Sequence, residues 1–136
     1  MPIHILGIIT DQVTVSKMDG TRGSVLYLYK IPFRLSRTPS ALWRELFIHL
    51  WNIPPRWTTR HRPGIASVYG DQIILDGTTI EEVRDVHRET LMLCVSEANK
   101  TEQKYLEEEQ RRQEWETMQK KRHFENVADI AGDIKF

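Results

Sequence analysis

The segment between Thr78 and Gly132 contains neither glycine nor proline. These two residues are the main interrupters of helices, so the segment is predicted to be helical over most of its length. Within it, residues 107–114 are all Glu, Gln or Arg. This run is longer than two helical turns of ~3.6 residues each, and therefore no face of the helix can enter a core there. The sequence thus predicts a long C-terminal helix that extends beyond the core.

The remainder of the chain is large enough for one ordinary core. The chain has 136 residues, of which 40% are hydrophobic and 9% aromatic. A domain of this size does not need disulfides or metals to fold. We expect a compact domain over residues 1–106 and a charged helical extension over residues 107–136.

Three segments near the N-terminus predict strands. Residues 3–9 are apolar on both faces, which is typical of a central strand. Residues 13–16 alternate between apolar and polar, and residues 25–31 are rich in β-formers. Pro32 should confine the third strand to an edge or a bulge, because proline cannot donate to the ladder. Residues 17–24 contain two glycines and predict a turn or flexible loop.

A helix is predicted over residues 40–52. Thr38 is the expected cap, and Pro39 is the expected first helical residue. One broad face of this helix is apolar, and it consists of Leu42, Trp43, Leu46, Phe47, Leu50 and Trp51.

A hairpin and a second helix follow. Gly70-Asp71 joins the apolar segments 65–69 and 72–75, as in a type II′ hairpin. Thr79 and Glu82 have the spacing of a capping box, which places the start of the second helix there. Together these elements predict an α+β fold, with a four- or five-stranded, mostly antiparallel sheet covered by two helices. The C-terminal helix is the long one.

The loop 54–64 is the most suggestive segment for ligand contact. It carries the candidate contact residues Arg56, Trp57, Arg60, His61 and Arg62. Arginine forks suit phosphate and an indole face can stack on a base, so nucleic-acid binding is one interpretation. Acid–base work by Arg and His on an RNA backbone is a second. A structural role is the third, in which Trp57 fills the edge of the core and the arginines pair with the acidic second helix.

No pattern indicates a metal, a cofactor or a nucleotide. Cys94 is the single cysteine and lies in an apolar stretch, so it is expected to be buried. None of the five histidines has a second His or Cys at the short spacing of a zinc site. His87 lies on the apolar stripe of the second helix, where a hydrogen-bonded boundary residue is expected. Phosphate-binding glycine motifs and nucleophile elbows are absent from the sequence, which argues against an enzyme without excluding one.

The apolar residues of the C-terminal extension are sparse and are of types that anchor a helix in a partner's groove. The candidate partner-binding residues are Trp115, Met118, Phe124, Val127 and Ile130. Docking on another chain, including a second copy, is the preferred interpretation. Docking on the same chain and disorder are the alternatives. The principal hypothesis is a non-catalytic protein-interaction or oligomerisation module that acts through this helix. The alternative is a nucleic-acid-binding protein that uses the loop 54–64.

Charge and hydropathy set the remaining expectations. Lys plus Arg and Asp plus Glu both total 19, so the chain as a whole is not a strongly basic nucleic-acid binder. No apolar run approaches the ~18 residues of a membrane span. We therefore expect a soluble, cytoplasmic protein without a membrane partner.

Overall fold

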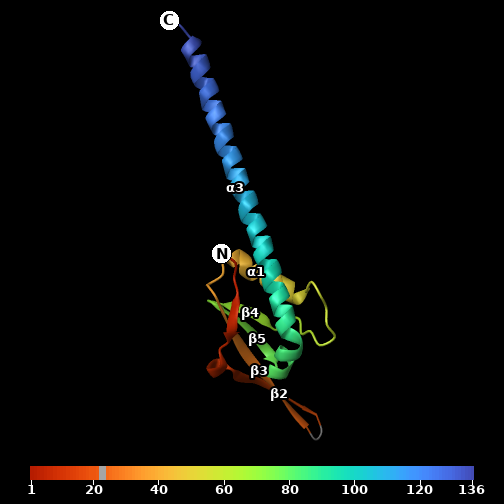
Figure 1. The fold of residues 1–136 in the computed structure, drawn as a ribbon. Coiled ribbons are helices and arrows are strands. Elements are labelled where there is room, and N and C mark those ends of the chain that lie inside the picture. Colours follow the sequence, from red (N-terminus) through yellow and green to blue (C-terminus); the bar gives the residue numbers. More distant parts are fainter. Residues whose placement is uncertain (22–23) are drawn as a thin grey trace. The chain divides into compact units, whose positions relative to one another are not determined.

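The computed structural model describes residues 1–21 and 24–136, and side chains outside residues 17–26 (Figure 1). The chain divides into two compact units, Met1–Glu102 and Gln103–Phe136. The boundary that we expected between the compact domain 1–106 and the charged extension 107–136 stays a prediction.

The first unit is built on a five-stranded antiparallel sheet, as predicted. Its strands are β1 (Ile5–Ile8), β2 (Thr14–Thr21), β3 (Ser24–Leu35), β4 (Ala66–Tyr69) and β5 (Gln72–Thr78). The order is β1-β3-β5-β4, and β2 also pairs with β3. A 3-10 turn, η1 (Thr10–Gln12), separates β1 from β2, and these two strands pair with successive parts of β3. The long strand β3 is therefore the centre of the sheet.

The predicted central position of residues 3–9 is wrong. Among the described strands, β1 pairs with β3 alone and therefore lies at an edge. Ile3, just before β1, is fully buried in the core, whereas Leu6 of β1 remains 66% exposed. The loop expected over residues 17–24 is also shorter than predicted, since β2 continues to Thr21 and β3 begins at Ser24. Residues 22–23 lie outside the described part of the chain.

Pro32 lies inside the central strand, so its expected confinement to an edge or a bulge is wrong. The Pro32 carbonyl accepts a hydrogen bond from the Ile9 N–H (3.0 Å). In an antiparallel strand the N and the carbonyl of one residue face the same neighbour. The Pro32 nitrogen, which carries no hydrogen, therefore faces the interruption between β1 and β2. No hydrogen-bond donor is needed there.

The first helix, α1 (Ala41–Asn52), begins at a different cap from the one predicted. Ser40 is the N-cap, and its side chain accepts a hydrogen bond from the Trp43 N–H at 3.1 Å. Ser40 has the extended backbone that a cap requires, so Pro39 precedes the helix instead of starting it. The predicted apolar face is confirmed, with Trp43, Phe47 and Trp51 fully buried.

The hairpin and the second helical region follow the predicted signals closely. Gly70 has φ +58°, a conformation that favours glycine, and it opens the turn between β4 and β5. The helical region begins with α2 (Ile80–Glu82) and η2 (Val83–His87), and continues as α3 (Arg88–Asp133). Thr79 caps it by accepting from the Glu82 N–H at 3.1 Å. The segment η2 is π-helical, a local widening often found at functional sites.

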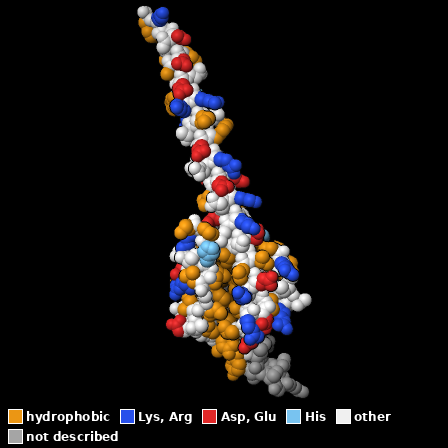
Figure 2. Space-filling view, viewed as in Figure 1, with side chains coloured by type: hydrophobic (Ala, Val, Ile, Leu, Met, Phe, Trp, Pro, Cys, Tyr) orange, Lys and Arg blue, Asp and Glu red, His pale blue; other side chains and the backbone are white. Residues whose placement is uncertain are grey.

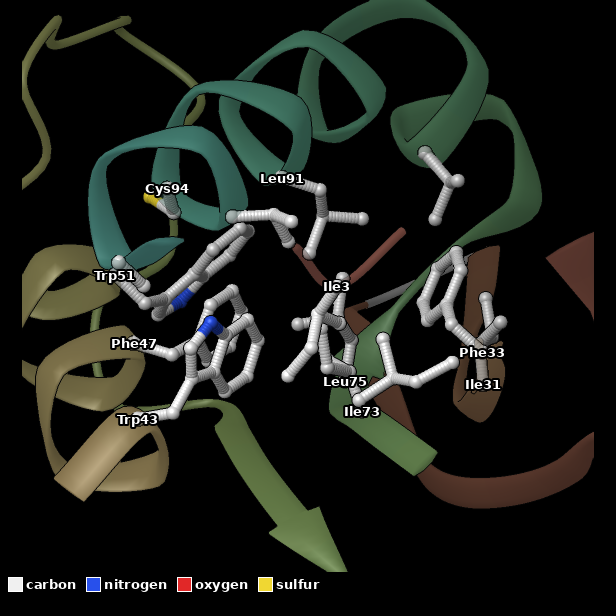
Figure 3. Close-up of a cluster of buried hydrophobic side chains, with 14 residues drawn as sticks. Ile3, Ile31, Phe33, Trp43, Phe47, Trp51, Ile73, Leu75, Leu91 and Cys94 are labelled. Carbon is white, nitrogen blue, oxygen red and sulfur yellow. The ribbon is translucent and has the colours of Figure 1, made fainter. Parts of the chain in front are cut away.

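The core of the first unit lies between one face of the sheet and the helices (Figure 3). Alternate residues of β3, namely Ile31, Phe33 and Leu35, point to this face and are almost completely buried. Phe33 lies opposite Ile73 of β5 in the ladder. The helices contribute the buried side chains Trp43, Phe47, Trp51, Leu91, Cys94, Val95 and Ala98.

Candidate functional site

The loop 54–64 packs on the start of the second helical region through one strong ion pair. The Arg62 guanidinium donates to both carboxylate oxygens of Glu82 at 2.9–3.2 Å, and Thr78 Oγ1 donates to the same carboxylate at 2.9 Å. Burial by itself would raise the pKa of Glu82. The hydrogen bonds from Arg62 and Thr78 outweigh that effect and hold the pKa of Glu82 below its usual value of 4.5. Arg62 therefore has a structural partner, and its fork is not free for phosphate.

The other two arginines of the loop are more exposed. Arg56 lies 3.7 Å from Glu89, and both side chains are about three-quarters exposed, so this pair contributes little. Arg60 is exposed. The pKa of Asp85 is lowered mainly by two hydrogen bonds that its carboxylate accepts from Arg84, and the charge of Arg60 adds to this effect. The structure therefore brings together only part of the predicted phosphate-contact set.

The aromatic residues of the loop divide into a buried anchor and an exposed rim. His61 Nε2–H donates to the Trp51 carbonyl (2.6 Å), and Trp51 Nε1–H donates to the Arg62 carbonyl (2.9 Å). These bonds tie the loop to the end of α1. The Trp57 and His61 rings are nearly perpendicular, with their centroids 5.4 Å apart, and Trp57 remains 57% exposed. In the structural interpretation of the loop Trp57 was expected to fill the edge of the core, but the tryptophan that is buried beside this loop is Trp51.

Beneath the loop lies His87, which is fully buried in η2. Its ring is 5.5 Å from the Trp51 ring and 6.4 Å from the His61 ring, centroid to centroid. Within the described part of the chain, neither His87 ring nitrogen has a hydrogen-bond partner, and His61 Nδ1 is buried without one as well. The expectation of a hydrogen-bonded boundary histidine is therefore wrong. Burial lowers the pKa of His87 to about 4, so the imidazole is neutral at pH 7.

This cluster does not form a metal site among the described side chains, where no three His, Cys, Asp or Glu residues converge. The two imidazoles supply two nitrogens, and a protein site for zinc normally has three or four ligands. His61 also uses its Nε2–H to hold the Trp51 carbonyl. A general-base role for His61 would therefore have to rely on Nδ1, which is buried.

The first unit also carries an apolar groove that sequence reasoning missed. It has a volume of about 920 Å³ and lies between the N-terminal strand and residues 83–100 of the helical region. Figure 2 shows apolar side chains exposed along the groove. Buried Ile3, Phe33 and Leu91 form part of its wall, while Leu6 and Met92 are 66% and 59% exposed. The exposure of Leu6 and Met92 is visible only in the structure, and the predicted central position of the N-terminal strand would have covered this space.

Asn99 joins the two walls of the groove. Its side-chain amide donates to the Ile3 carbonyl (2.9 Å), and its Oδ1 accepts from the Ile3 N–H (3.0 Å). The same Oδ1 accepts from the indole N–H of buried Trp43 (2.9 Å). One side chain thus holds the segment before β1, α1 and α3 together.

The candidate partner-binding residues of the second unit, Gln103–Phe136, are not buried as they would be on a core helix. Every side chain in it is exposed, and the five predicted partner-binding residues are 48–67% exposed. At about 100° per residue, Phe124, Val127 and Ile130 fall within an arc of about 120°. Trp115 and Met118 lie about 120° and 180° around the helix from Val127. The predicted set is therefore two apolar patches, not one.

Polar side-chain pairs support the helix where apolar residues are missing. Gln103 donates to Glu107 (3.1 Å), and Gln110 donates to Glu114 (3.2 Å), each one helical turn away. Arg112 pairs with Glu109. Each such pair stabilises a helix by roughly 0.2–0.5 kcal/mol, and together they favour helix without burial.

No helix in the described part of the chain is both long and apolar enough to cross a membrane. Comparison of the chain with protein-family models, with curated proteins and with solved structures found no match.

Proposed function

We propose that this chain is a non-catalytic oligomerisation module that associates with a second copy of itself through its C-terminal helix. The observation that carries this proposal is the exposure of Phe124, Val127 and Ile130 on one side of a helix whose side chains are all exposed from Gln103 onward. Isolated exposed apolar residues are ordinary, but a row of them at helical spacing is typical of a surface that a partner covers.

The free energy gained by covering the row in both copies is comparable with the cost of association. Covering a fully exposed Val, Ile or Phe side chain contributes roughly 1.5–3 kcal/mol. The three side chains are 48–67% exposed, so covering the row contributes about 3–5 kcal/mol per copy. Association costs an estimated 4–15 kcal/mol in lost translational and rotational freedom. A symmetric dimer uses the row twice for one such cost, which favours a dimer over capture of a single helix.

The test compares the solution mass of the full chain with that of a charged variant. Light scattering at two concentrations should give the wild type a mass near twice the 16.0 kDa of the monomer. Val127→Glu combined with Ile130→Glu should give the monomer mass, because the row then carries two charges that would have to be desolvated. A wild type that stays monomeric at both concentrations contradicts the proposal.

A matched control separates the row from a general effect of charge. Thr117→Glu with Gln119→Glu adds the same two charges to exposed positions of the same helix. This control should keep the wild-type mass. Trp115→Glu with Met118→Glu then shows whether the second patch takes part, since it lies on another side of the helix.

Nucleic-acid binding by the loop 54–64 is the second candidate, and one observation favours it. Trp57 remains exposed beside Arg56 and Arg60, which leaves an indole face and two guanidinium groups available to a single strand. Fluorescence anisotropy with labelled single-stranded RNA tests it. Arg56→Ala with Arg60→Ala should lower the salt slope of log K by about 1.4. A wild type that does not bind RNA at low salt would remove this candidate.

A further inference from the structure

We propose that the free edge of β1, together with the groove beside it, binds an extended peptide segment of a partner protein. The segment is apolar at alternate positions, carries an acidic residue at its end and adds a strand to the sheet. This site is separate from the C-terminal helix, because every residue that carries the inference lies in the unit Met1–Glu102.

The outer edge of β1 carries backbone groups that the sheet does not use. The His4 carbonyl accepts a hydrogen bond from the Ser36 N–H (2.8 Å), so His4 faces the side of β3. The Ile9 N–H donates to a carbonyl of β3 (3.0 Å) and faces the same side. Neighbouring residues of a strand turn their N–H and C=O groups in opposite directions. Ile5 and Ile8 therefore turn theirs away from β3, toward the edge of the sheet.

Asn99 shows that this edge accepts a partner. Its side-chain amide donates to the Ile3 carbonyl (2.9 Å) and accepts from the Ile3 N–H (3.0 Å). A residue of a neighbouring antiparallel strand makes the same pair of hydrogen bonds. Among the described residues, no backbone group outside the sheet bonds to Ile5 or Ile8. The edge is thus paired by a side chain at Ile3 and is open from Ile5 onward.

The groove has the length of a short strand. Its walls are β1 and residues 83–100 of the helical region, and β1 and α3 run in opposite directions (Figure 1). Measured from the contact between Ile3 and Asn99, Ile8 is about 17 Å along the strand and Arg88 is about 17 Å along the helix. The groove therefore accepts roughly five residues of extended chain, from Asn99 to Arg88.

The wall of the groove favours an apolar side chain at every second position. Buried Phe33, Leu91 and Val95 form part of this wall, and its volume of about 920 Å³ leaves room for further side chains. Successive side chains of a strand point to opposite faces. One face of an added strand therefore covers the wall, and the other face points to solvent.

The rim of the groove favours an acidic residue. Arg88 and Lys100 line the groove and are exposed, and no Asp or Glu is among the lining residues that the structure describes. Lys100 lies 3.6 Å from Glu97, whereas the described side chains form no ion pair with Arg88. A carboxylate at the end of the added strand therefore meets the cation of Arg88 at the open end of the groove.

A second copy of β1 and an acyl chain are poorer occupants. A second copy would bring its own Arg88 and Lys100 to the same groove, so like charges would meet. An acyl chain has no N–H or C=O groups along its length. It would remove water from the backbone of Ile5 and Ile8 without replacing the lost hydrogen bonds. An extended peptide satisfies both the backbone and the apolar wall.

The test uses the fluorescein-labelled peptide Glu-Val-Thr-Val-Thr-Val-Glu as the probe. Its valines share one face of a strand, and a glutamate at each end suits either strand direction. Fluorescence anisotropy with the full chain should show saturable binding. The matched control Glu-Val-Val-Val-Thr-Thr-Glu has the same composition and charge without the alternation, and it should bind about tenfold more weakly or worse. Absence of saturable binding, or equal binding of both peptides, would overturn the proposal.

Amide hydrogen exchange, measured by NMR, locates the contact. Exchange at Ile5 and Ile8 should slow when the probe binds, because their N–H groups then donate to the added strand. Ile9 is the internal control, since its N–H is already bonded to β3, and it should change little. Binding of the probe without protection of Ile5 and Ile8 would refute strand addition.

Charge reversal tests the rim. Arg88→Glu should weaken binding of the probe roughly 10- to 100-fold, because a carboxylate would then face a carboxylate. The matched control is Arg44→Glu, an exposed position of α1 that does not line the groove, and it should bind like the wild type. Equal effects of the two reversals would count against the rim.

The charged variant of the C-terminal helix separates this site from the oligomerisation surface. Val127→Glu with Ile130→Glu should bind the probe like the wild type, whatever its solution mass. Loss of probe binding in this variant would place the peptide on the helix and overturn the groove as its site.

Discussion

Lowering the pH from 7 to 5 should destabilise the first unit through one side chain, His87. The imidazole is fully buried, and neither ring nitrogen has a hydrogen-bond partner in the described part of the chain. Burial is the largest influence, and it lowers the pKa of His87 from 6.5 to about 4. The nearby carboxylate of Glu82 opposes this shift, while His61 and Arg62 add to it.

The sign and size of the effect follow from proton linkage. The neutral form is favoured in the folded protein, so the unfolded chain binds the proton first as the pH falls. The contribution to the free energy of unfolding is fully present above pH 6.5 and is lost progressively down to about pH 4. At 1.36 kcal/mol per pKa unit, the loss is about 2 kcal/mol at pH 5 and about 3 kcal/mol at pH 4.

Urea unfolding at pH 7, 6 and 5 measures this loss. With a typical slope of about 1–2 kcal/mol per molar urea, the wild-type midpoint should fall by roughly 1–2 M between pH 7 and pH 5. His87→Leu should lose most of that dependence, because the variant has no imidazole to protonate. The same substitution at exposed His49 is the matched control and should keep the wild-type dependence. If His87→Leu and the wild type lose equal stability, the reasoning about His87 is refuted.

Two other predictions concern the core and its connection to the N-terminal strand. Asn99→Ala removes three hydrogen bonds and leaves the buried Trp43 indole N–H without its partner, so we expect a loss of about 2–4 kcal/mol in thermal unfolding. Asn126→Ala on the exposed helix should change little, and an equally small effect at Asn99 would contradict its connecting role. Burial raises the pKa of the Cys94 thiol to about 12, so a thiol reagent at pH 8 should label the native chain only as fast as the chain opens. Rapid labelling of the native chain would show that Cys94 is accessible.

Local interactions explain the parts of the fold that were predictable. The apolar spacing of Trp43, Phe47 and Trp51 indicated the buried face of α1, because helical neighbours are only three or four residues apart. Gly70 indicated its turn because few other residues adopt a positive φ. Thr79 indicated the start of the second helical region through a hydrogen bond that spans three residues.

The incorrect predictions concern residues whose surroundings are set by segments that are distant in the sequence. The edge position of β1, the tolerance of Pro32 in β3 and the unpartnered burial of His87 all depend on which elements lie beside these residues. The candidate loop shows the same division. One interpretation of the sequence already had the arginines pairing with the second helix, but which arginine pairs closely, namely Arg62 with Glu82, depends on a contact between separate elements.

The sequence by itself determined the α+β class, the antiparallel sheet and the long polar helix, because periodicity, turn residues and the run 107–114 act over a few neighbouring positions. The tertiary structure alone decided that β1 is an edge strand and that a groove opens beside it. The contact that holds this groove together joins Ile3 to Asn99, 96 residues apart in the chain. The sequence pattern does not indicate such a contact, because the contact forms only when the core brings the two segments together.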